Sequence, residues 1–252
     1  MAKIIRRLQN VSGGVTRLAE LTPKVFIFDK GGTLIDVHPM WSAWARELAR
    51  RLTAAAGESV SDRLFRAMGV DPRSQRIRPD GWLATTTMDE LRELTVGLMR
   101  EAGLSPEDAA AAVAAAWHAP DPVAEAQPLA DLRTVFRTLR ERGANVTVAT
   151  MDDRAPTEAT LADLELDRWV DGVVCGDDGV APKPAPDMVL AICQQLGEQP
   201  ASAVVVGDSL ADVEMGRRAG VGLTVGVLTG VTPEAALRRR ADVVVESVAE
   251  LI

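Results

Sequence analysis

The sequence is poor in several features, and each shortage excludes a class of protein. Its 252 residues include only two cysteines, Cys175 and Cys193, too few for a disulfide framework, which favours a reducing, cytoplasmic environment. Basic residues are outnumbered: 28 lysines and arginines stand against 36 aspartates and glutamates, so the formal charge is −8. A general nucleic-acid binder needs a basic face, so this composition argues against one. No stretch approaches the ~18 uninterrupted apolar residues of a membrane helix, which argues against a membrane protein.

What remains is typical of a globular α/β protein, with 47% hydrophobic and 25% charged residues. From Leu129 to Ile252 short apolar runs alternate with helical patterns, and one similar run stands apart near the N-terminus, which predicts parallel strands buried on both faces. The predicted strands are 25–28, 146–149, 170–174, 203–206, 223–227 and 243–245. The predicted helices between the later strands are 130–142, 155–166, 185–197, 211–219 and 233–240.

The segment between the first strand and the others has a different pattern. It shows helical periodicity and almost no β-branched runs; for example, Trp44, Leu48 and Leu52 share one helical face. Its predicted helices are 40–56, 59–69, 88–102 and 106–118. We therefore expect a helical insert in an α/β domain. The predicted parts are an N-terminal extension at 1–22, an α/β core at 23–37 and 126–252, and a helical insert at 38–125.

Two polar segments follow predicted strands at the edge where open α/β sheets bind ligands. In Asp29–Thr33 an aspartate is followed by Gly31 and Gly32, which let the backbone turn sharply and offer N–H groups to an anion. Thr150 follows the second strand, and its hydroxyl can donate to a phosphate oxygen. The alternatives are an ordinary strand-ending turn for the first segment and a helix N-cap region for the second.

Two further segments supply charge. Lys183 lies between Pro182 and Pro184, in a chain with four lysines against 24 arginines, and a compact ammonium there suits an anion. The alternative is a surface-loop lysine. Asp208 and Asp212 lie four residues apart at a strand-to-helix transition, and carboxylate oxygens are ligands that Mg²⁺ prefers. The alternative is a helix N-terminus whose dipole favours acidic residues without any metal.

In this order and in these strand contexts, the four segments resemble the motifs of the haloacid dehalogenase superfamily, specifically its phosphatase branch with a helical cap. The resemblance extends from Val25 to Ile252. It implies a three-layer, Rossmann-like α/β core with a parallel sheet and an α-helical cap inserted after the first strand. Such a cap would close over the sheet edge, exclude water during transfer and select the leaving group.

The resemblance also implies a chemistry. Asp29 would attack a phosphoryl group of a small phosphorylated metabolite and become an aspartyl-phosphate, which water then hydrolyses. The implied catalytic residues are Asp29, Thr150 and Lys183. The implied Mg²⁺ ligands are Asp29, the carbonyl of Gly31, Asp208 and Asp212, the last either directly or through water. The implied phosphate-binding residues are Gly32, Thr33, Thr150 and Lys183.

The first motif departs from the family pattern at Gly31. Phosphatases of the superfamily usually carry an aspartate there as general acid and base, a role typically worth ~10²–10⁴ in rate. A leaving group of low pKa, as in an acyl phosphate or anhydride, needs little protonation and would tolerate the loss. Alternatively, another group replaces the aspartate, although His38, beside Pro39, is expected to be a hinge or surface residue. The candidates near in sequence are Asp36, His38, Asp152 and Asp153.

Other functions remain open at this stage. One is a catalytically impaired protein that binds phosphate or a metabolite, and another is phosphotransfer to an acceptor other than water. Two relatives that also lack the second aspartate are disfavoured. Phosphonoacetaldehyde hydrolases form a Schiff base through a lysine of the insert, and residues 38–125 contain no lysine. Haloacid dehalogenases dispense with metal, whereas Asp208 and Asp212 retain the metal-type carboxylates.

Overall fold

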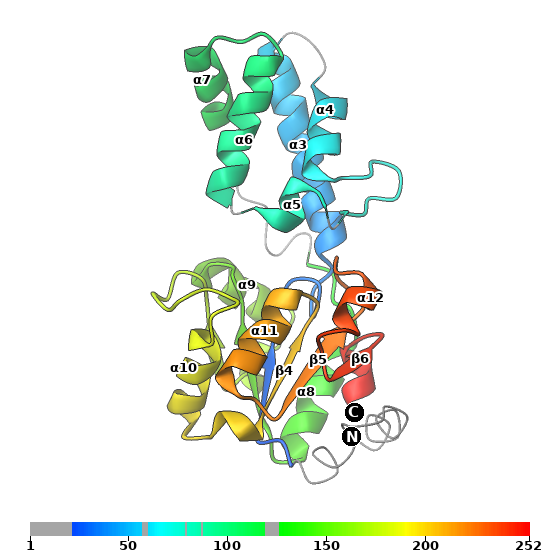
Figure 1. Ribbon diagram of the computed structural model, residues 1–252, viewed down its shortest axis with the longest axis vertical. Helices are drawn as coiled ribbons and strands as arrows, with labels where there is room; N and C mark the ends of the chain where they lie inside the picture. Colours follow the sequence, from blue (N-terminus) through cyan, green and yellow to red (C-terminus); the bar gives the residue numbers. More distant parts are fainter. Residues whose placement is uncertain (1–21, 57–59, 79, 87, 119–125) are drawn as a thin grey trace. The chain divides into compact units, whose positions relative to one another are not determined.

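A computed structural model describes residues 22–56, 60–78, 80–86, 88–118 and 126–252. The chain divides into two compact units. We call Val37–Asp121 the helical unit, and Met1–Asp36 with Pro122–Ile252 the α/β unit. Apart from residue 22, the predicted N-terminal extension at 1–22 lies outside the described residues. Figure 1 shows the elements of each unit.

The α/β unit is built on a six-stranded parallel sheet in the order β3-β2-β1-β4-β5-β6. The strands are β1 Val25–Phe28, β2 Asn145–Ala149, β3 Gly172–Val174, β4 Ala203–Gly207, β5 Leu223–Val227 and β6 Val243–Val245. This is the Rossmann order, in which the chain reverses its direction of progress across the sheet between β1 and β4. The predicted parallel, Rossmann-like class is therefore confirmed. Strand β3 begins later than predicted because Asp167–Trp169 form a 3-10 turn, η1, that Val170 caps.

Helices cover both faces of this sheet, which makes three layers. Side chains alternate along each strand. Phe26 and Phe28 face one layer, where the ring centroids of Phe28 and Phe136 are 5.2 Å apart. Val25 and Ile27 face the other layer. The first layer contains α8 Leu132–Glu141 and α9 Arg154–Asp163, with the 3-10 turn η3 Val248–Leu251; the second contains α10 Asp187–Leu196 and α11 Leu210–Ala219. The remaining elements are η2 Pro200–Ser202 and α12 Glu234–Leu237, which is shorter than predicted.

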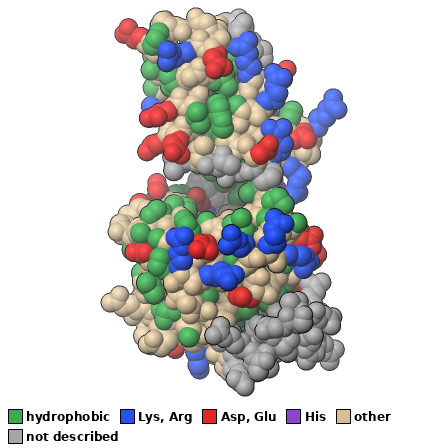
Figure 2. All heavy atoms as spheres, in the orientation of Figure 1, with side chains coloured by type: hydrophobic (Ala, Val, Ile, Leu, Met, Phe, Trp, Pro, Cys, Tyr) green, Lys and Arg blue, Asp and Glu red, His purple; other side chains and the backbone are tan. Residues whose placement is uncertain are grey.

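The surface of the α/β unit carries interspersed charges of both signs (Figure 2). Many belong to ion pairs between residues four apart, such as Arg218 with Glu214 in α11 and Arg238, which follows α12, with Glu234. Exposed pairs of this kind contribute little stability. None of the described helices is long and apolar enough to cross a membrane.

The helical unit has a hydrophobic core of its own, in which Trp44, Leu48 and Leu52 are buried as their spacing predicts. Its helices are α3 Val37–Ala56, α4 Ser61–Met68, α5 Trp82–Thr85, α6 Met88–Glu101 and α7 Pro106–Ala116. The short helix α5 was not predicted. His38 is not a surface residue: it is buried in α3, where its Nδ1 accepts a hydrogen bond from the Ile77 N–H at 3.1 Å. The polar imidazole of His38 is tolerated in the interior because its Nδ1 is paired with a backbone N–H of the segment after α4.

Candidate active site

Two acidic residues lie at the point where the sheet order reverses. Asp29 directly follows β1 and Asp208 directly follows β4, and these strands pair with Phe28 opposite Val206. The Asp29 N–H extends this pairing by donating to the Val206 carbonyl at 2.9 Å. Together with Asp212, the two residues each offer a carboxylate oxygen, and these oxygens lie within 4.8 Å of one another. The carboxyl edge of β1 and β4 therefore carries a compact cluster of three acids.

Asp212 reaches this cluster from the first turn of α11. Its Oδ2 accepts hydrogen bonds from the Ser209 N–H at 3.0 Å and the Ser209 hydroxyl at 2.6 Å, and the Ser209 Oγ accepts from the Asp212 N–H. This pattern is a capping box, so Asp212 also has the structural role at a helix N-terminus that its sequence position allowed. A Cβ at Gly207 would lie 2.4 Å from the Asp212 Cβ, which explains why glycine ends β4. One oxygen of Asp212 thus caps the helix while the other faces the cluster.

Lys183 is the positive group of the cluster. Its ammonium donates to Asp29 Oδ1 at 2.5 Å and to Asp212 Oδ1 at 2.6 Å. Its side chain is only 3% exposed, so the alternative of a surface-loop lysine is wrong. A buried ammonium is tolerated here because two carboxylates contact it.

The acids retain more negative charge than one lysine can neutralise. Burial raises the pKa of Asp29 to about 7. The Lys183 ammonium opposes this rise, and the negative charge of Asp212 adds to it. Burial, with the charges of Asp29 and Asp212, also raises the pKa of Asp208 well above its usual value. For Lys183, burial alone lowers the pKa, but the charges of Asp212 and Asp29 more than reverse this effect. Buried oxygen ligands with surplus negative charge fit a divalent cation such as Mg²⁺.

Asp208 is held by a loop that the sequence reasoning missed. The Val231 N–H donates to Asp208 Oδ2 at 3.2 Å, and the Thr229 hydroxyl donates to the Gly32 carbonyl at 2.6 Å. A Cβ at Gly230 would lie 1.8 Å from Asp208 Oδ2, and one at Gly32, where φ is +79°, would lie 2.7 Å from its carboxyl group. Two glycines therefore enclose this carboxylate. The available signal was a Thr-Gly pair after β5, the strand beside β4.

The remaining predicted residues lie on the turns after β1 and β2. Thr33 is fully buried, and its hydroxyl is 3.5 Å from Asp208 Oδ1. Thr150 directly follows β2, is 2% exposed, and its Oγ1 accepts a hydrogen bond from the Asp152 N–H at 3.2 Å. The Lys30 ammonium lies 2.7 Å from Asp152 Oδ2. The predicted site residues therefore all lie at one edge of the sheet, whereas their roles stay predictions.

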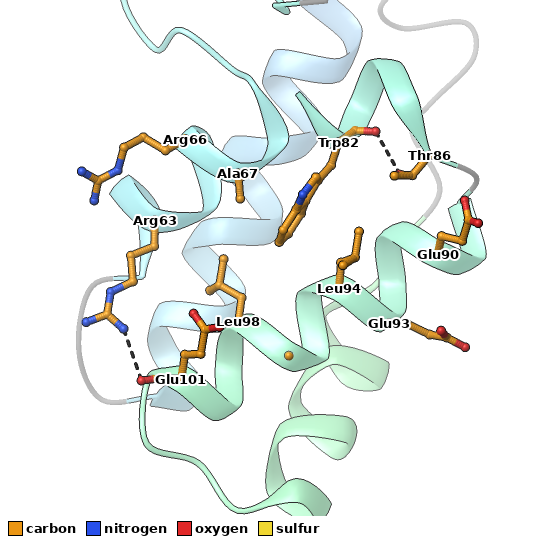
Figure 3. A pocket seen from close by; sticks show the side chains of 11 residues that line it. Arg63, Arg66, Ala67, Trp82, Thr86, Glu90, Glu93, Leu94, Leu98 and Glu101 are labelled. Carbon is orange, nitrogen blue, oxygen red and sulfur yellow. Dashed lines mark hydrogen bonds between the residues drawn. The ribbon is translucent and has the colours of Figure 1, made fainter. Parts of the chain in front are cut away.

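The helical unit contains a groove of about 940 Å³ with a different character (Figure 3). Trp82 and Leu94 point into the space between α4 and α6. Its charged lining residues are exposed, unlike the buried charges of the α/β unit. These charged residues are Arg63, Arg66, Glu90, Glu93 and Glu101.

Comparison with known proteins shows which family this chain resembles. Residues 23–220 match the family model of haloacid dehalogenase-like hydrolases. A β-phosphoglucomutase of Mycobacterium bovis is 40% identical over 116 residues, which cover 43% of this chain and 44% of that protein. A phosphoglycolate phosphatase of Aquifex aeolicus is 26% identical over 226 residues, covering 88% and 95%.

Among solved structures, a putative β-phosphoglucomutase from Thermotoga maritima has the same fold. Its TM-score is 0.63 at 21% identity, and the match covers 90% of this chain and 96% of that one. The alignment with the mycobacterial mutase spans less than half of that relative, whereas the fold likeness spans nearly the whole chain. The chain belongs to the haloacid dehalogenase-like hydrolase family.

Proposed function

We propose that the protein is a Mg²⁺-dependent phosphohydrolase that acts on a small phosphorylated metabolite through an aspartyl-phosphate on Asp29. The observation that carries this proposal is the buried cluster of Asp29, Asp208 and Asp212 around the Lys183 ammonium. Relatives named for phosphoglycolate and phosphoglucose chemistry support a small phosphorylated substrate. The two cysteines are free and buried, which fits a protein of the reducing cytoplasm.

The acidic cluster suits the metal. The residues that would hold Mg²⁺ are Asp29, Asp208, the carbonyl of Gly31 and, directly or through water, Asp212. The raised pKa values of Asp29 and Asp208 support this assignment, because they reflect first the burial of these carboxyl groups and then the charges of neighbouring acids. When bound, the ion supplies positive charge that polarises the phosphoryl group and lets an anion approach these carboxylates.

The protein's own groups would carry out the transfer in two steps. In the first, an ionised Asp29 oxygen attacks phosphorus, a P–O bond forms, and the bond to the leaving group breaks with its electron pair. In this proposal Lys183 and Thr150 bind the phosphoryl oxygens, together with the backbone of Gly32 and the hydroxyl of Thr33. In the second step, water attacks phosphorus and frees Asp29. Positioning and charge neutralisation dominate catalysis of this kind.

Gly31 restricts the first step. Glycine has no proton to give to the leaving oxygen, so alkoxide leaving groups of simple phosphomonoesters are disfavoured. Leaving groups of low pKa, as in acyl phosphates or anhydrides, depart without that help. A relative from Caldanaerobacter subterraneus, 32% identical over 123 residues, is named a putative pyrophosphatase, an activity that would break such an anhydride.

Two other functions have specific support. The likeness to a β-phosphoglucomutase favours phosphotransfer to an acceptor other than water. The glycine at position 31 favours a protein that binds a phosphorylated metabolite without turning it over. Both would use the same cluster, so they differ from hydrolysis in the fate of the phosphoryl group.

The test is a panel of phosphorylated metabolites, acyl phosphates and pyrophosphate, with and without Mg²⁺. We expect Mg²⁺-dependent phosphate release, none from Asp29→Asn, and increased phosphomonoesterase activity in Gly31→Asp. Binding without turnover across the panel would support the metabolite-binding function. Transfer of phosphate to an added sugar phosphate, in place of release, would support the phosphotransferase. Circular dichroism of each variant checks that it is folded.

A further inference from the structure

A second charged pair lies beside the acidic cluster, on the turns after β1 and β2. These strands pair in parallel with Phe28 opposite Val148, so the turns that follow them leave the sheet side by side. Lys30, from the first turn, and Asp152, from the second, form an ion pair with 2.7 Å between Nζ and Oδ2. The Lys30 side chain is 10% exposed and that of Asp152 is 44% exposed. A buried cation thus holds a carboxylate that still reaches solvent.

The backbone on both sides of this pair is held in place. The Asp152 N–H donates to the Thr150 hydroxyl oxygen at 3.2 Å, and its carbonyl accepts from the Gly176 N–H at 3.0 Å. The Lys30 carbonyl accepts from the Leu34 N–H at 2.9 Å, which closes the turn after the nucleophile. Catalytic groups require this kind of preorganisation, because small displacements cost rate.

Asp152 is also close enough to the predicted nucleophile to act on it electrically. Its negative charge contributes to raising the pKa of Asp29. Among the sequence neighbours that could replace the missing acid–base residue, Asp153 is exposed at the start of α9. His38 is buried in the helical unit, with its Nδ1 occupied by the Ile77 N–H. Asp152 instead contacts Lys30, the residue next to Asp29, so the geometry favours Asp152 over Asp153 and His38.

We propose that Asp152, held in place by Lys30, is the base that takes a proton from the water that hydrolyses the aspartyl-phosphate on Asp29. This assignment rests on the proposed function. The water oxygen forms a bond to phosphorus while the P–O bond to Asp29 breaks, and the electron pair returns to the Asp29 carboxylate. The water proton passes to Asp152 and then to solvent, which its exposure permits, and inorganic phosphate leaves.

The same arrangement explains why Asp152 replaces only half of the missing function. In this ion pair the Asp152 carboxylate accepts from the Lys30 ammonium, so the geometry presents it as a proton acceptor and not as a donor to a leaving group. Departure of the leaving group in the first step therefore receives no proton from this residue. Asp152 thus supports the second step and leaves the preference for weakly basic leaving groups unchanged.

The experiment follows p-nitrophenyl phosphate in the presence of Mg²⁺ by stopped-flow absorbance, with acid quenching to trap the phosphorylated protein. Its p-nitrophenolate leaving group needs no protonation, so the first step is isolated from acid catalysis. We expect Asp152→Asn to show a burst of about one p-nitrophenolate per protein, followed by turnover that is ~10²-fold slower than wild type. The quenched Asp152→Asn protein should carry accumulated phosphate. Asp153→Asn, the matched control, should behave as wild type, and Asp152→Glu should recover part of the turnover.

The outcomes separate this inference from the proposed function. Wild-type turnover in Asp152→Asn overturns the role of Asp152 and leaves the phosphohydrolase intact. A folded Asp152→Asn protein that shows neither burst nor turnover also overturns it, because Asp152 would then act in the first step. A wild-type protein that neither turns over nor becomes phosphorylated with Mg²⁺ removes the proposed function, and the role of Asp152 falls with it.

Discussion

The two units of this chain differ in whether their described residues include buried Asp, Glu, Lys or Arg side chains. In the α/β unit, Lys183 and Asp212 have side chains 3% and 2% exposed and contact each other at 2.6 Å. In the helical unit, Glu47 pairs with Arg50 and Arg51 at 2.7 Å, but the Arg50 side chain is 70% exposed. Buried charges are costly unless they are paired, and proteins retain them mainly where they are used. The difference supports the proposal that the chemistry belongs to the α/β unit, and it indicates that apolar packing stabilises the helical unit.

Removing one cation from each unit tests this difference most strongly. Lys183→Met leaves the Asp29 and Asp212 carboxylates buried without their partner, and we expect a loss of about 3–5 kcal/mol in the free energy of unfolding. Arg50→Ala removes an exposed partner and should leave stability unchanged within error. Urea unfolding of both variants at pH 8, without Mg²⁺, measures the two effects. Equal losses in the free energy of unfolding would show that burial does not make Lys183 more important for stability than the exposed Arg50.

The pH dependence of stability sharpens the comparison. The pKa of Asp29 is raised from 3.8 to about 7, so between these values the folded protein binds more protons than the unfolded chain. Stability of the metal-free protein should therefore fall as pH rises from about 4 to about 7, and Asp208 adds to this trend. Thermal unfolding in EDTA across that range measures it. In Asp29→Asn the decline should be smaller, and a profile that rises over this range would contradict the burial of uncompensated acids.

Two glycines provide the smallest test. Gly230→Ala would place a Cβ against Asp208, and we expect ~10–100-fold weaker Mg²⁺ binding, measured by calorimetry. Gly97 lies inside α6 of the helical unit, where a Cβ would meet nothing within 4 Å in the described part of the chain beyond the backbone of its own helix. Gly97→Ala should therefore stabilise the protein by about 0.5–1 kcal/mol. Unchanged Mg²⁺ affinity in Gly230→Ala would mean that the loop after β5 does not position Asp208.

Much of the fold could be predicted because local patterns decide it. Val25–Phe28 is a strand of four apolar residues, and its bounds and those of Leu223–Val227 agree with prediction. Continuous apolar runs of this short length are typical of strands that are buried on both faces. The 3-10 turn before β3 and the four-residue α5 were missed because their signals are as short as the elements themselves.

The positions of the main acidic residues of the candidate site were also predictable, but their contacts with other turns were not. Asp29 and Asp208 each follow a strand, and parallel strands present their carboxyl ends at one edge, so their proximity follows from pattern and topology. The contacts of Thr229 with Gly32 and of Lys30 with Asp152 join residues far apart in sequence. No local pattern predicts them, because side-chain packing between different turns creates them.

By itself, the sequence determined the parallel α/β class, the helical insert and the set of polar residues after the strands, since these depend on periodicity and on local chain geometry. Only the tertiary structure decided that Lys183 is buried between Asp29 and Asp212, that His38 belongs to a packed interior, and that Asp152 pairs with Lys30. The physical reason is that burial and electrostatic coupling depend on which distant segments meet, whereas secondary structure depends mainly on neighbours in the chain.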